Sequence, residues 1–99
     1  MDWSRPTAEN REELAAVHGR LRAAGVAPGP AGYDVAALAG AVEARGWRWE
    51  AAPTQPGAAA PYHATVEGGE GPAGAAYYAF GWGADVALAR ALDRMLRGR

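Results

Sequence analysis

The apolar and polar positions of this chain repeat with two different periods, and each change of period marks the border of a predicted element. Val35, Leu38 and Val42 recur at the spacing of one helix face. Asp34 precedes them as a helix-capping residue, and Gly46 follows them where a left-handed glycine commonly ends a helix. The pattern therefore predicts a short amphipathic helix.

Three segments in which alternate side chains are apolar follow this helix, and a period of two is typical of strands with one buried face. The side chains expected to face inward are Trp47, Trp49, Ala51, Tyr62, Ala64, Val66, Ala76, Tyr78, Phe80 and Trp82. The connections 53–60 and 68–74 are rich in glycine and proline and too long for two-residue hairpins. Together the segments predict an antiparallel meander of three strands.

A second helical pattern follows the strands, with Asp85 as its expected capping residue. Its apolar positions, expected to face the sheet, are Val86, Leu88, Ala89, Leu92, Met95 and Leu96. The polar positions expected to face solvent are Arg90, Asp93, Arg94 and Arg97. This helix and the one before the strands can therefore cover the same face of the sheet.

The N-terminal part of the chain predicts a further helix, capped by Ser4 or Thr7. Its apolar stripe of Leu14, Val17 and Leu21 is narrow, so we expect this helix to lean on its own domain or on a second subunit. The glycines and prolines that follow cannot continue a helix. The predicted parts are an N-terminal helix (residues 1–25), a Gly/Pro linker (26–32) and a core domain (33–99).

The elements together predict the fold class α+β, in the order α-α-β-β-β-α, with a three-stranded antiparallel sheet and the helices on one face. A chain of 99 residues suffices for one small core. Its net charge of -1 provides no field that would attract a polyanion or an anionic membrane. All ten basic residues are arginine, and alanine, glycine and proline are abundant, which is typical of GC-rich bacterial or phage genes.

The residue types that the chain lacks limit its chemistry. Without cysteine it can form no disulfide, zinc–thiolate site or thiol nucleophile. His18 and His63 are far apart and make no metal-ligand pattern, so we expect no metal and no cofactor. The sequence has no apolar run long enough to span a bilayer and no signal-peptide pattern, and we expect a cytoplasmic protein.

The α-β-β-β-α order of residues 33–97 is similar to that of the double-stranded RNA-binding domain. The closing sequence YYAFGWGADVALARALDRML resembles that family's last strand, which runs through a Gly-x-Gly turn into an alanine-rich helix. The resemblance covers about two thirds of the chain. It implies the family's fold, with both helices of the domain on one face of the sheet.

The residues with which that family binds duplex RNA are different here. The family has lysines at the start of its last helix and a Gly-Pro-x-His loop, whereas this chain has Gly83, Ala84 and Asp85 at the helix start. An acidic residue at this position repels phosphate. The corresponding loop, residues 57–61, contains no histidine. The resemblance therefore implies the fold without duplex RNA as the partner.

The outward face of the sheet is the candidate binding surface, because no predicted element covers it. The residues expected side by side on this face are Arg48, Glu50, His63, Thr65, Glu67 and Tyr77. His63 and Glu67 could share a proton as a general acid–base pair if a pocket removed them from water. The alternative is an ordinary solvated face with charge pairs between strands.

The strands are also rich in aromatic residues, which could stack nucleic-acid bases if they were exposed. Their alternation places most of them inside, with Tyr77 as the expected exception and Trp82 free to lie on either side. The turn Gly81-Trp82-Gly83 lacks the third glycine or the lysine of known phosphate-binding loops. Base stacking is therefore a secondary hypothesis, and a tight strand-to-helix turn explains the two glycines.

The function that these observations favour is that of a small non-enzymatic binding or assembly module. Its partner would be a second copy, bound through the N-terminal helix with Trp3 ahead of it, or another protein. The alternative is a weak or single-stranded nucleic-acid-binding protein that uses the sheet face and Arg90, Arg94, Arg97 and Arg99. A small enzyme using His63 and Glu67 is the third hypothesis, and it requires a deep pocket over the sheet.

Overall fold

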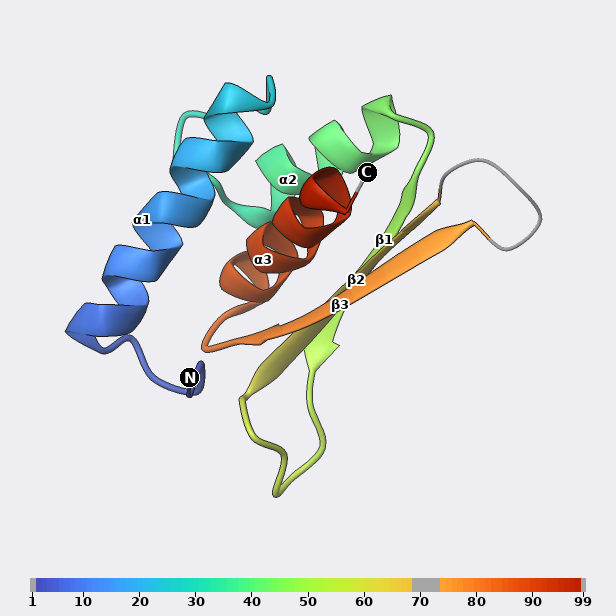
Figure 1. Cartoon of the computed structure of the whole chain (residues 1–99). Coiled ribbons are helices and arrows are strands. Elements are labelled where there is room, and N and C mark those ends of the chain that lie inside the picture. The colour runs from blue at the N-terminus through green and yellow to red at the C-terminus, as the bar shows by residue number, and fades with distance from the viewer. Residues whose placement is uncertain (1, 69–73, 99) are drawn as a thin grey trace.

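The fold is α+β in the predicted order α-α-β-β-β-α, in a computed structural model that describes residues 2–68 and 74–98. The helices are α1 (Ala8–Ala23), α2 (Val35–Ala44) and α3 (Ala84–Arg97), and the strands are β1 (Arg48–Pro53), β2 (Tyr62–Gly68) and β3 (Ala75–Gly81). The strands form one antiparallel sheet in the order β1-β2-β3. All three helices lie on one side of it, and α1 reaches the sheet layer through α3 (Figure 1).

Local hydrogen bonds explain where the helices begin. The side chains of Thr7 and Asp34 each accept a hydrogen bond from a backbone amide in the first turn of α1 and α2, as the sequence predicts. The prediction for α3 is wrong, because Gly83 is its N-terminal cap and no side chain caps the helix. Asp85 lies in the first turn of α3, where its negative charge suits the positive end of the helix dipole.

The core lies between the helices and the inner face of the sheet. Its largest almost fully buried apolar side chains are Leu21, Val26, Leu38, Val42, Val66, Leu88, Leu92 and Met95. Val26 belongs to the Gly/Pro-rich segment 26–32, in which Gly29 and Gly32 close a turn with two hydrogen bonds of 2.9 and 3.0 Å. The hydroxyl of Tyr33 donates a hydrogen bond to the carbonyl oxygen of Val26. Segment 26–32 thus contributes a side chain to the core.

Strand β3 has the opposite phase from the predicted one. Tyr77 pairs with Val66 on the inner face and packs against the core, so its predicted place on the outer face is wrong. Tyr78 and Phe80, predicted to face inward, lie on the outer face. The inward side chains predicted for β1 and β2 are confirmed, since Trp49 and Val66 both contact the core.

The close approach of α3 to the sheet explains this phase. Gly81 faces α3, and a Cβ atom built on it would lie 2.7 Å from the backbone nitrogen of Ala87. Ala79, on the same face, is 2% exposed. Only small side chains fit between β3 and this part of α3, so the larger aromatic rings face away from the helix. Within the parts of the chain that the structure describes, each helix is too short or too polar to cross a bilayer.

Candidate functional site

The outer face of the sheet brings together the predicted site residues of β1 and β2. The strand register places Arg48 opposite Glu67 and Glu50 opposite Thr65, with His63 two positions further along the same face. The Nε atom of Arg48 lies 3.1 Å from a carboxylate oxygen of Glu67. Because both side chains are largely exposed, we expect this ion pair to contribute at most about 1 kcal/mol to stability.

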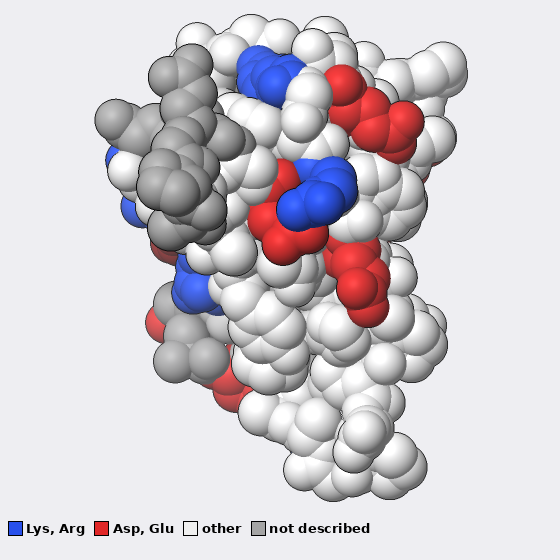
Figure 2. All heavy atoms as spheres, turned by 90° about the vertical axis from the view of Figure 1, so that its right-hand side faces the viewer, with Lys and Arg blue, Asp and Glu red and all other residues white. Residues whose placement is uncertain are grey.

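The molecule seen from the side away from α1 has mixed charge in one part and none in another. Basic and acidic side chains lie close together in the upper and middle parts of this view, and the lower right is white, without charged residues (Figure 2). A surface with both signs of charge beside a neutral area provides no uniform field for a polyanion. Its recognition properties therefore depend on individual side chains.

Three rings on the outer face, those of His63, Tyr78 and Phe80, form a cluster that we call the aromatic trio. The His63 ring stacks on Tyr78 with the ring centroids 5.6 Å apart, and Tyr78 meets Phe80 edge to face at 5.0 Å. Tyr78 is 45% exposed, more than any other large apolar side chain among the described residues. The Nδ1 atom of His63 is buried without a hydrogen-bond partner among them. Tyr78 therefore takes the exposed position that the sequence pattern assigned to Tyr77.

His63 and Glu67 do not form the acid–base pair that their spacing allowed. They are four residues apart on β2, which separates their Cα atoms by about 13 Å along an extended strand. Glu67 pairs with Arg48, and His63 stacks on Tyr78. The two side chains thus have different partners and cannot exchange a proton directly.

A second group of interacting side chains lies beside the sheet, and Trp3 is at its centre. The Trp3 ring stacks on Trp82 with centroids 5.7 Å apart, and the guanidinium carbon of Arg90 lies 3.9 Å from the Trp3 centroid. The buried side chain of Asn10 holds this segment in place, because its Nδ2 donates hydrogen bonds to two carbonyl oxygens in the residues before α1. The sequence pattern placed Trp3 in a partner-binding arm with the first helix, whereas here its ring packs on Trp82 and Arg90 of the same chain.

Two arginines of α3 cover the free edge of β3. Arg90 donates a hydrogen bond to the carbonyl oxygen of Phe80, and Arg94 donates one of 2.6 Å to that of Tyr78. Neither guanidinium forms an ion pair with any acidic residue that the structure describes. Burial, together with the charge of Arg94, lowers the pKa of Arg90 to about 10. Arg90 remains charged at neutral pH, but its charge is poorly solvated.

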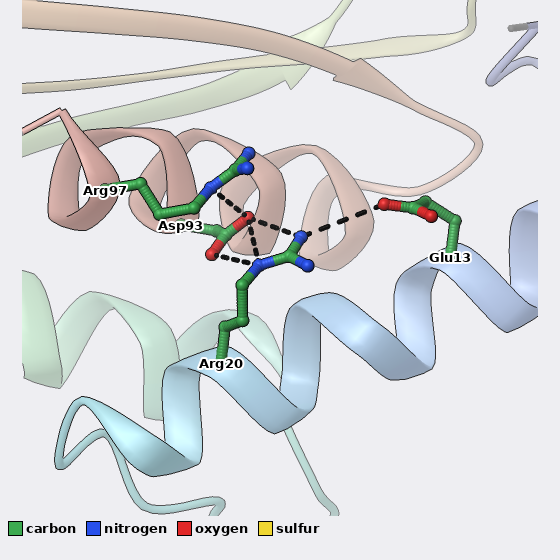
Figure 3. Close-up of polar contacts among 4 residues, drawn as sticks. All are labelled: Glu13, Arg20, Asp93 and Arg97. Carbon is green, nitrogen blue, oxygen red and sulfur yellow. Dashed lines mark hydrogen bonds and ion pairs between the residues drawn. The ribbon is translucent and has the colours of Figure 1, made fainter.

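Asp93 joins α3 to α1 and is 2% exposed, although the sequence pattern placed it on the solvent side. Arg20 of α1 donates to both carboxylate oxygens, at 2.9 to 3.3 Å, and Nε of Arg97 lies 3.2 Å from one of them (Figure 3). Glu13 lies 3.8 Å from Arg20. The predicted exposure of Asp93 is wrong because α1 covers this side of α3. Hydrogen bonding to Asp93 raises the pKa of Arg20.

These side chains surround a cleft of about 340 Å³ between α1 and α3, which we call the arginine cleft. Its lining residues are Trp3, Glu13, Val17, Arg20, Arg90, Asp93, Arg94 and Arg97. A neighbouring hollow of about 260 Å³ shares Trp3, Arg90 and Arg94 with it and reaches Tyr78 and Phe80. The arginine cleft and the aromatic trio are therefore adjacent parts of one surface.

Comparison of the chain with protein-family models, with curated proteins and with solved structures finds no match.

Proposed function

We propose that the chain is a small non-enzymatic binding module of the cytoplasm, and that it meets a protein partner with the outer face of its sheet. The observation that carries the proposal is the aromatic trio, whose central ring, Tyr78, is 45% exposed on the face of the sheet opposite α1, α2 and α3. Exposed tyrosines are frequent energetic centres of protein interfaces.

The surroundings of the trio support an interface of ordinary composition. Phe80 and His63 pack against the ring of Tyr78, which reduces the side-chain entropy that Tyr78 would lose when a partner binds. Arg48, Glu50 and Glu67 supply a polar rim of mixed charge along the same face. An apolar centre with a polar rim is the arrangement found in transient protein interfaces.

The likeness to double-stranded RNA-binding domains extends, in this proposal, to the arrangement of elements and not to the ligand. The start of α3 carries Gly83 and Asp85 in place of lysines, so duplex phosphates have no cations to meet there.

Site-specific photocross-linking in the cells that express the protein tests the proposal. We expect a photoreactive phenylalanine derivative at position 78 to yield a discrete cross-linked product. The same derivative at the exposed position Ala36 of α2 should not yield this product. A product of twice the chain's mass would identify a second copy as the partner. Identical products from the two positions, or none from position 78, would contradict the proposal.

The second candidate function is weak binding of single-stranded nucleic acid, and one observation favours it. Arg90 and Arg94 lie along the same strand edge as Tyr78 and Phe80, so cations and stacking rings are neighbours. Arg97 extends this set; Arg99 lies outside the described residues. Fluorescence anisotropy with a labelled oligonucleotide should show affinity that falls steeply with salt. Absence of binding at low salt would exclude this function.

A further inference from the structure

We propose that the arginine cleft binds a phosphoryl group, carried either by a small phosphorylated molecule or by a phosphodiester backbone. The proposal concerns the side of the molecule between α1 and α3, so it does not depend on a protein partner at the sheet face. It rests on the charge balance of the cleft, on guanidinium donors that Asp93 does not use and on two arginines that form no ion pair among the described residues.

The charge of the cleft matches a dianion. Four arginines and two carboxylates line it, which leaves an excess of two positive charges. A phosphate monoester carries about -1.5 to -2 charges at neutral pH, whereas a carboxylate carries only one. The volume of about 340 Å³ lies in the range of small-molecule sites and leaves room for an organic group beside the phosphate.

Asp93 orients two of the arginines and uses only part of their donors. A guanidinium has five N–H donors. Arg97 meets Asp93 with its Nε atom, and its terminal nitrogens point away from the carboxylate (Figure 3). Arg20 uses Nε and one terminal nitrogen for Asp93, so its other terminal nitrogen is free of that carboxylate. A buried carboxylate thus fixes donors in place before any ligand arrives.

Arg90 and Arg94 supply charge that no ion pair among the described residues neutralises, although Glu13 partly offsets the charge of Arg90. They are one helical turn apart, and like charges at this spacing repel each other. Arg90 is also partly buried, with Trp3 against its guanidinium. Burial and the repulsion from Arg94 keep the pKa of Arg90 below its ordinary value. A bound phosphoryl group would relieve both costs, and this is the thermodynamic reason to expect an anion at this place.

Nitrogen-15 NMR of the full chain tests the proposal through the Nε–Hε resonances of the arginines. Sodium phosphate is titrated at pH 7 against sodium chloride of equal ionic strength, so that general screening is the same in both series. The resonances expected to shift saturably are those of Arg20, Arg90, Arg94 and Arg97. The resonances of Arg11 and Arg48, which line neither the arginine cleft nor the neighbouring hollow, should not move.

Three variants separate an effect on phosphate binding from damage to the fold, because one should weaken binding, one should tighten it and one should leave it unchanged. R94Q removes one charge-assisted contact and should weaken phosphate binding by about tenfold. E13Q removes a negative charge from the cleft wall and should tighten binding by about threefold, a gain that unfolding cannot produce. R11Q, with the same charge change as R94Q on the exposed side of α1, should leave the affinity within about twofold.

Two further titrations identify the source of the phosphoryl group and its chemical class. If a single-stranded oligothymidylate shifts the same resonances at lower concentration than phosphate, the source is a phosphodiester backbone. A response to phosphate without one to the oligonucleotide indicates a small phosphorylated ligand. Acetate should bind several-fold more weakly. Three results would overturn the proposal. They are a response to acetate equal to that to phosphate, the lack of a saturable response to either phosphate or the oligonucleotide, and the same phosphate affinity in wild type, R94Q and E13Q.

Discussion

Gly81 shows how much of this fold depends on the absence of a single carbon atom. It is the last residue of β3, and a Cβ atom there would lie 2.7 Å from the backbone nitrogen of Ala87 and 2.8 Å from a methyl group of Val86. Atoms at such distances repel strongly, and the backbone of α3 cannot rotate away as a side chain could. The glycine therefore sets the distance between the sheet and α3, the helix that contributes more buried apolar residues than any other described element.

The G81A variant should lower the free energy of unfolding by about 1 to 3 kcal/mol, because α3 has to shift outward to admit the methyl group. Gly19 offers a matched control, since it lies within α1 and a Cβ there meets no atom within 4 Å. G19A should raise stability by about 0.5 to 1 kcal/mol through better helix propensity. Urea denaturation followed by circular dichroism measures both changes, and equal changes of the same sign would refute this explanation.

His18 links stability to pH. Its ring contacts Tyr33 with centroids 4.8 Å apart, and burial lowers its pKa below 6.5. Asp85 of α3 opposes this shift, while Arg22 of α1 adds to it. Between the folded pKa and 6.5 the unfolded chain binds more protons than the folded one, so stability rises with pH. The contribution of neutral His18 is complete above pH 6.5 and is lost as the pH falls through its folded pKa.

We therefore expect the free energy of unfolding of the wild type to decrease between pH 7 and pH 5 more than that of H18Q. Carboxylates that titrate in both proteins cancel when the two curves are subtracted. Urea denaturation at several pH values provides the measurement. Parallel curves for the two proteins would show that His18 does not titrate differently in the folded and unfolded chains.

At the scale of elements, the attachment of α1 to α3 has a polar and an apolar part. Val17 and Leu21 bury their side chains in the common core, and Arg20 between them reaches the carboxylate of Asp93. Such a charged contact fixes the register of two helices more sharply than apolar contacts, because a shift of one residue would leave a carboxylate buried without a partner. It also holds one wall of the arginine cleft in place.

The D93N variant keeps the shape of the side chain and removes its charge. We expect it to lower the free energy of unfolding by about 2 to 3 kcal/mol, less than for a fully buried pair because Arg20 is partly exposed. A double-mutant cycle with R20Q should give a coupling energy between Asp93 and Arg20 that accounts for most of this loss. E67Q, which breaks the exposed pair with Arg48, should cost less than about 1 kcal/mol. A similar loss in D93N and E67Q would contradict the structural role of Asp93.

The order of the elements and the faces of α2, β1 and β2 could be predicted, because in each the larger apolar side chains lie on one side, opposite polar side chains in the strands and small ones in α2. In β3 both sides are apolar, with Tyr77 and Ala79 on one and Tyr78 and Phe80 on the other. Alternation then predicts a strand but not which side is buried. The answer depends on the distance to α3, which a hydrophobicity pattern does not contain.

The candidate site, too, could be predicted from the sequence only in part. Arg48 and Glu67 could be placed on one face because residues opposite each other on neighbouring antiparallel strands point to the same side of the sheet. The arginine cleft could not be predicted, since it is assembled from Trp3, α1 and α3, and no local pattern marks residues that meet across that distance. The burial of Asp93 follows from the position of Arg20, 73 residues earlier in the chain.

At the scale of the whole molecule, the N-terminal third completes the core. A chain that starts at Gly32 lacks Trp3, α1 and the buried Val26. We expect the full chain to be a monomer, because the apolar side chains of α1 are already used within one copy. The shortened chain should bind a hydrophobic dye and lose its cooperative thermal transition.

Size-exclusion chromatography with light scattering, combined with thermal denaturation, measures both outcomes on the two chains. A full chain that is a dimer, together with a shortened chain that is a folded monomer, would contradict this expectation. That result would instead make α1 an assembly element between two copies.

The distance in sequence between Arg20 and Asp93 also determines when α1 can dock during synthesis. The carboxylate is added 73 residues after the arginine, an interval of about 4 to 15 s at ordinary translation rates. During this interval α1 emerges from the ribosome while α3, which packs against it, is still unmade. Of these two helices α1 emerges first and stays unburied until α3 follows, so a ribosome-associated chaperone would find the apolar stripe of α1 exposed only on the nascent chain.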